Sequence, residues 1–142
     1  MSLVELHLPP DTQFVGLARL VVVTAARRCG MDEERLEDLR IAVSEATTNA
    51  IQAHQRTEEA ERVVLSFGTR PADDVFQVTI ADAGPGFEPL QAADRADRDW
   101  HMEGGLGITL IRNLADDVEF VRGEGMQVHL RFGMSLSSNC VP

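Results

Sequence analysis

Hydrophobic and polar residues along the chain predict five strands and three helices. Apolar residues alternate with polar ones in the expected strands and recur every three or four residues in the expected helices. The strands are predicted at residues 3–8, 62–69, 75–81, 118–122 and 126–134, and the helices at residues 13–29, 32–54 and 106–115. Short polar connections at residues 70–74 and 123–125 predict two hairpins. We therefore expect one domain over residues 1–134, followed by a frayed tail at residues 135–142.

The first predicted helix has more apolar residues than a single stripe requires. Asp11 or Thr12 can cap its start, and Gly30 follows its end as a stop signal. Such a helix either packs deeply in the core or forms part of an interface, and the sequence leaves both possibilities open. One side of this helix carries Phe14, Leu17, Leu20, Val21 and Thr24.

The second predicted helix has a clearer amphipathic pattern. It begins after Asp32, and Glu33 and Glu34 occupy the first turn, where the helix dipole favours acidic side chains. Its period predicts one apolar stripe that faces the core. That stripe consists of Leu36, Leu39, Val43, Ala46 and Ala50.

Composition and charge narrow the classes of function. The formal net charge is −10, and all 13 cationic residues are arginines. The absence of lysine excludes a P-loop, whose lysine contacts the β- and γ-phosphates. The arginines do not form the clustered cationic surface that nucleic-acid binding requires, so we expect no direct nucleic-acid binding.

No membrane or secretory segment is predicted. The longest aliphatic run, residues 20–23, is too short to span a bilayer, and no basic segment precedes an apolar stretch at the start of the chain. We therefore expect a cytoplasmic protein with no membrane partner. Cys29 and Cys140 lack metal-ligand spacing and are expected to be free thiols.

The first candidate motif, residues 45–50, lies on the second predicted helix. Glu45 and Asn49 are four residues apart, so both project from the same side of that helix. An asparagine carbonyl oxygen suits Mg²⁺, which also takes oxygens from substrate phosphates. The Glu45 carboxylate could deprotonate an attacking hydroxyl. Taken alone, the pair also fits a solvated helix face.

The second motif, residues 82–87, directly follows a predicted strand. Asp82 supplies an acceptor oxygen, which can take a hydrogen bond from an exocyclic amine such as N6 of adenine. Gly84 and Gly86 allow the backbone to approach a ligand closely. Ordinary turn chemistry explains the same residues equally well when they are considered alone.

The third motif opens the third predicted helix, after a long aperiodic segment from Asp82 to Gly105. Gly104, Gly105 and Gly107 surround Leu106 at the expected helix start. Free backbone N–H groups at a helix start, together with glycines, can bind phosphate without a lysine. A flexible hinge is the alternative explanation for this pattern.

The three motifs in this order resemble the N, G1 and G2 boxes of the GHKL ATPases, and the likeness covers residues 4–132. Segments 44–51 and 104–111 are most similar to the anti-sigma-factor serine protein kinases of that superfamily. The resemblance implies an α+β fold of the Bergerat type, a two-layer α/β sandwich. Its sheet would be mixed but mostly antiparallel, with about three helices on one face.

The resemblance also implies roles and partners. Asn49 would coordinate Mg²⁺, Glu45 would act as the catalytic base, and Asp82 would bind adenine. The phosphate loop would be shaped by Gly84, Gly86, Gly104, Gly105, Leu106 and Gly107. Members of this family are ATP-dependent serine/threonine protein kinases. They bind a sigma factor and phosphorylate a serine on a small antagonist protein, usually as homodimers.

Two positions depart from the family pattern. Met126 follows Gly125 where the family usually has a threonine that supports the adenine-binding aspartate. Ala53 and His54 stand in the reverse of the usual order, which turns the imidazole to another side of the helix. Met126 favours an alternative function, a binding module that holds nucleotide weakly and regulates by protein contacts alone. A split histidine kinase fits less well, because no helical hairpin carrying a phosphoacceptor histidine precedes the first motif.

Overall fold

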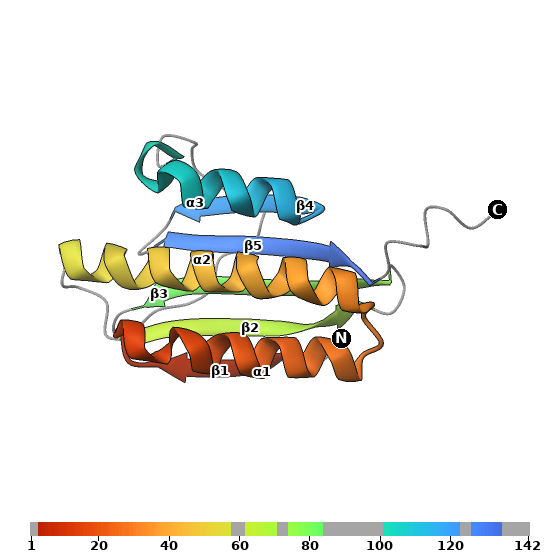
Figure 1. Ribbon diagram of the computed structural model, residues 1–142. Helices are drawn as coiled ribbons and strands as arrows, with labels where there is room; N and C mark the ends of the chain where they lie inside the picture. Colours follow the sequence, from red (N-terminus) through yellow and green to blue (C-terminus); the bar gives the residue numbers. More distant parts are fainter. Residues whose placement is uncertain (1–2, 58–61, 71–73, 84–100, 123–125, 135–142) are drawn as a thin grey trace.

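The computed structural model describes residues 3–57, 62–70, 74–83, 101–122 and 126–134. Helices form one layer and a five-stranded sheet forms the other (Figure 1). This arrangement confirms the predicted two-layer α+β fold. The helical elements are η1 (Thr12–Phe14), α1 (Val15–Arg28), α2 (Glu33–Thr57) and α3 (His101–Leu114). The strands are β1 (Val4–Leu8), β2 (Arg62–Arg70), β3 (Val75–Ala83), β4 (Asp117–Arg122) and β5 (Met126–Gly133).

The sheet has the strand order β1-β2-β3-β5-β4, and each of these neighbouring pairs is antiparallel. The two predicted hairpins, β2–β3 and β4–β5, are both present. β3 therefore occupies the middle of the sheet, and α2 packs against it from the helical layer. α1 and α3 lie on either side of α2 (Figure 1).

The core lies between the helices and the covered face of the sheet. Alternate residues of β2, β3 and β5 point into it, as the period of two predicts. The largest fully buried side chains include Phe67, Phe76 and Phe132. In α2 the predicted stripe is confirmed, because Leu36, Leu39, Val43 and Ala46 are buried and Ala50 is partly buried against the core.

The structure shows which side of α1 faces the core. The buried residues are the small ones, Ala18, Val22, Val23 and Ala26, whereas Leu17 and Leu20 are 43% and 63% exposed. Small side chains spaced four residues apart let α1 approach α2 and the sheet closely. Asp11 caps the short turn η1 that leads into α1, because its side chain accepts a hydrogen bond from the Gln13 amide. Gly30, just past the end of α1, takes a φ of +103°.

None of the helices in the described ranges combines the length and the apolar character that crossing a membrane requires. Cys29 is exposed and unbonded at the end of α1, as expected. Cys140 lies outside the described residues.

The sheet face opposite the helices carries a half-buried histidine. His129 alternates with the core residues Val128 and Leu130, and its Nδ1 lies 3.0 Å from the Thr79 hydroxyl on β3. Burial lowers the pKa of His129 below its usual value of 6.5. Glu119, opposite on β4, raises that pKa and Arg131 lowers it further, but burial is the largest cause.

His129 predicts a pH dependence of stability. The folded chain keeps the imidazole neutral, whereas the unfolded chain protonates it near its usual pKa, so stability falls as the pH decreases below about 6.5. The loss is complete below the lowered pKa of the folded state. Urea unfolding at pH 7.5, 6.5 and 5.5 measures it, and His129→Gln should flatten this part of the profile. An unchanged pH profile in the variant would show that other groups cause the effect.

Candidate functional site

Glu45 and Asn49 lie one turn apart on α2, and both are half-buried. At 100° per residue they share one side of the helix, as predicted. Thr47, midway between them, points to the opposite side and is fully buried. The motif therefore divides into a buried side and an accessible side that carries the carboxylate and the amide.

The accessible side of α2 meets Gly107 of α3. A methyl group at Gly107 would lie 2.8 Å from Oε1 of Glu45, and 3.7 and 3.8 Å from Nδ2 and Oδ1 of Asn49. Residues that are about 60 positions apart in the sequence thus come into direct contact. The structure brings the first and third candidate motifs together at one place.

Asp82 lies within β3, where its partner on β2 is Val63. The sequence placed it just after the strand, but the backbone pairing continues to Ala83. Asp82 alternates with the core residues Val78 and Ile80, so it faces the helical layer, and it is 7% exposed. Asp82, the predicted adenine-binding residue, therefore lies in the central strand of the sheet, on the face that the helices cover.

Met126 begins β5, the other neighbour of β3. The register ends with Ala81 opposite Gln127, and one further step brings the backbone of Met126 opposite Asp82. The position where the family usually has a threonine is therefore next to the predicted adenine-binding aspartate. Gln127, buried at 1% exposure, follows it on the other face of the sheet.

The predicted start of the third helix is wrong. α3 begins at His101 rather than at Leu106, so Gly104, Gly105 and Leu106 lie inside its first turns. Glycine is unfavourable in a helix by about 1 kcal/mol relative to alanine, but it does not terminate one, whereas proline would. The helix start, where amides are free, thus lies ahead of the glycines. Gly84 and Gly86 lie outside the described residues.

The residues of the site fit a metal ion that is held partly by a substrate. Within the described ranges, no group of three or more His, Cys, Asp or Glu side chains could hold a metal ion. The oxygen of Asn49 is a hard, neutral donor, and Mg²⁺ commonly combines one or two such protein ligands with substrate phosphates and water.

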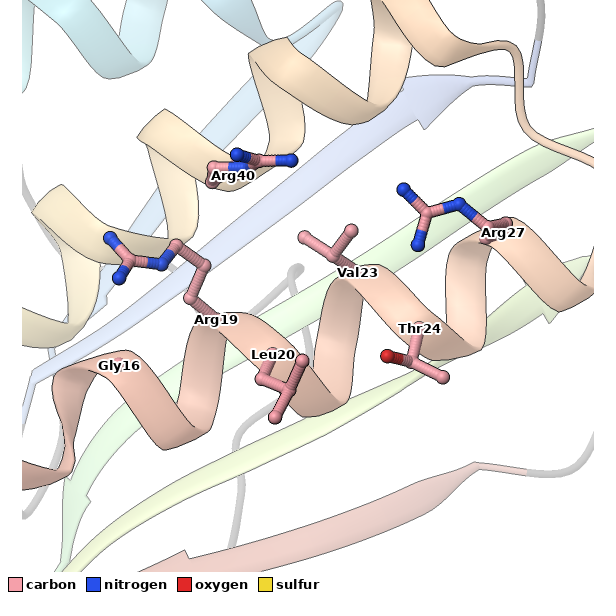
Figure 2. Close-up of a pocket in the computed structure, with 7 residues that line it drawn as sticks. All are labelled: Gly16, Arg19, Leu20, Val23, Thr24, Arg27 and Arg40. Carbon is pink, nitrogen blue, oxygen red and sulfur yellow. The ribbon is translucent and has the colours of Figure 1, made fainter.

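A separate hollow of about 560 Å³ lies between α1 and α2 (Figure 2). It contains none of the predicted site residues, and sequence analysis did not find it. The one sequence signal for this hollow is the spacing of its α1 residues. They recur three to four residues apart and therefore share one side of the helix. The lining residues are Gly16, Arg19, Leu20, Val23, Thr24, Arg27 and Arg40.

Two of the three arginines in this hollow are already paired within the chain. Arg27 lies 3.3 Å from Glu33, and Arg40 lies 3.2 Å from Glu37. Arg19 donates to the hydroxyl of Ser44 at 3.4 Å. These contacts are exposed, so each stabilises the fold by little.

Comparison with known proteins shows the family. A family model described as a histidine kinase-like ATPase domain matches residues 8–132. The chain belongs to the histidine kinase-like ATPase family. Several proteins that it resembles in sequence are named serine-protein kinase RsbW. The Bacillus pumilus protein is 33% identical over 137 residues, covering 90% of this chain and 83% of the relative. The Bacillus subtilis protein is 33% identical over 134 residues, covering 88% and 81%.

A solved structure has the same fold as this histidine kinase-like ATPase. It contains the RsbU and RsbW domains of Rv1364c from Mycobacterium tuberculosis, and it superposes with a TM-score of 0.67 at 16% identity. The match covers 93% of this chain and 32% of the solved chain. The family membership implies ATP binding, which agrees with the expectation from the three motifs.

Proposed function

We propose that this chain is an ATP-dependent serine protein kinase that acts as an anti-sigma factor. It phosphorylates a serine of a small antagonist protein and sequesters a sigma factor when the antagonist does not oppose it. Residues 1–134 form the single kinase domain, which works as a homodimer. Relatives that are named serine-protein kinases, about a third identical over most of their length, support this reaction.

The contact between α2 and α3 carries the proposal. It places a carboxylate, Glu45, and an amide, Asn49, against a glycine of the third motif. Phosphoryl transfer demands mainly positioning and charge neutralisation, and both need such groups at one place. Asp82, buried in the neighbouring strand, is suited to accept a hydrogen bond from adenine.

The proposed chemistry assigns one role to each side chain. Asn49 would hold Mg²⁺ by its carbonyl oxygen, and the bound ion would supply charge neutralisation at the phosphates. Glu45 accepts the proton of the substrate serine as the serine oxygen takes the γ-phosphoryl group from ATP and ADP leaves. The half-buried setting of Glu45 limits water around the carboxylate while leaving it accessible to a hydroxyl.

One observation favours a second function. Met126 comes one residue before Gln127, the partner of Ala81, and a methionine lacks the hydroxyl that usually supports the aspartate. A chain that binds adenine weakly could still bind its protein partners. In that case the protein regulates by contacts alone, without phosphoryl transfer.

Incubation with labelled ATP, Mg²⁺ and the cognate antagonist protein separates the two functions. We expect phosphoserine on the antagonist and none when Mg²⁺ is chelated. Complex formation with the antagonist but no phosphoserine would overturn the kinase proposal and support the binding module. Phosphohistidine instead of phosphoserine would contradict both.

A further inference from the structure

Gly107 sits in the body of α3 and faces α2. We propose that Gly107 is a positioning residue for the Glu45 carboxylate. Because glycine has no side chain, it leaves free the space that this carboxylate occupies. The inference rests on the proposed kinase function, since it assigns Gly107 to the proton-accepting step. The family resemblance by itself implied only that Gly107 helps to shape the phosphate loop.

The geometry distinguishes Glu45 from its neighbour Asn49. A methyl group at Gly107 would lie 2.8 Å from Oε1 of Glu45, closer than real methyl groups approach an oxygen. The same methyl group would lie 3.7 and 3.8 Å from the amide atoms of Asn49, which is ordinary van der Waals contact. Alanine at Gly107 would therefore displace the carboxylate and leave the amide in place.

Backbone conformation does not explain a glycine at this position. Gly107 lies inside a regular helix, where glycine is less favourable than every residue except proline. In contrast, Gly30 has a φ of +103°, which most side chains rarely adopt. Space for Glu45 is thus the reason that the structure offers for Gly107.

Helical Gly16 provides a matched control. A methyl group there would meet only the Arg19 side chain, at 3.6 Å, and Figure 2 shows Gly16 on α1. Gly16→Ala and Gly107→Ala thus make the same chemical change in two helices. Only the second change affects a carboxylate.

The test combines Gly107→Ala with Glu45→Asp, whose carboxylate is one methylene shorter. With Mg·ATP and the cognate antagonist, we expect Gly107→Ala to lower kcat by roughly tenfold or more, while the Kd for Mg·ATP changes by less than about threefold. The double variant should be no slower than Glu45→Asp alone, because both changes act on one group. Gly16→Ala should behave as the wild type.

The proposal would be overturned if Gly107→Ala and Glu45→Asp lowered kcat by factors that multiply in the double variant. It would also be overturned if Gly107→Ala weakened Mg·ATP binding and left kcat unchanged. The melting temperature of Gly107→Ala should not fall, because the tip of Glu45 can swing away and alanine favours the helix. A large fall would mean that Gly107 is needed for packing and not for placing the carboxylate.

A second measurement is independent of activity. The carboxyl ¹³C resonance of Glu45 can be assigned by its loss in Glu45→Gln. We expect Gly107→Ala to shift this resonance and Gly16→Ala to leave it unchanged. An unshifted resonance would refute the positioning role. If the wild type transfers no phosphate, the proposed function fails, but this resonance still reports whether Gly107 sets the position of the Glu45 carboxylate.

Discussion

Replacing Asn49 with alanine is expected to abolish the Mg²⁺-dependent part of ATP binding. The amide oxygen of Asn49 is the proposed protein ligand, and it lies on the accessible side of α2 beside Glu45 and Gly107. Loss of a metal ligand removes the bridge between protein and phosphates, so we expect the affinity to fall by about 100-fold or more. This fall corresponds to about 2.8 kcal/mol of binding free energy.

Isothermal titration with ATP, with and without Mg²⁺, measures the effect. Without Mg²⁺ the variant and the wild type should bind ATP similarly, since Asp82 is unchanged. Asn113→Ala is the matched control, because Asn113 is exposed near the end of α3. Undiminished Mg²⁺-dependent binding in Asn49→Ala would show that the metal ligand has been assigned wrongly.

Replacing Arg35 with methionine is expected to destabilise the fold strongly. The Arg35 side chain is 5% exposed and joins α2 to the ends of α3 and β5. It forms ion pairs with Asp38 at 2.8 Å and with Asp116 at 2.7 Å. It also donates to the carbonyl oxygens of Gly133 and Leu114, and its guanidinium lies 5.1 Å from the centre of the Phe132 ring.

Methionine could fill much of the space but would remove every hydrogen bond that Arg35 donates, although Asp116 would keep the Gly133 amide as a donor. Asp116 is 59% exposed and Asp38 is 27% exposed, so water can solvate both carboxylates in part. The two partly buried carbonyl groups lose a charged donor and the packing on Phe132 is lost, so we expect a cost of about 3 kcal/mol. For a chain of this size that cost lowers the melting temperature by roughly 10 °C.

Arg40→Met serves as the control for the Arg35 experiment. Arg40 also pairs with a carboxylate on its own helix, but its side chain is 43% exposed. Exposed ion pairs contribute little, so the free energy of unfolding of Arg40→Met should stay within about 0.5 kcal/mol of the wild-type value. If both variants melt at the same temperature, the buried arginine does not hold these elements together.

The sequence alone determined most of the local structure. Alternation identified each strand, and the three-to-four spacing identified α2 and its buried stripe, because these periods follow from backbone geometry. The same geometry predicted that Glu45 and Asn49 share one side of α2. The short polar connections predicted the two hairpins. Family likeness in three motifs then indicated the fold.

Only the tertiary structure decided what depends on contacts between distant segments. The sequence left open which side of α1 is buried, and close helix packing buries Ala18 and Val22 while the larger Leu17 and Leu20 stay exposed. The start of α3 was missed, since glycines weaken a helix without ending it. No spacing rule connects Gly107 with Glu45, and no local pattern reveals that Arg35 is buried among three elements. These contacts arise when α2 packs between α1 and α3, which is decided by shape across the whole core.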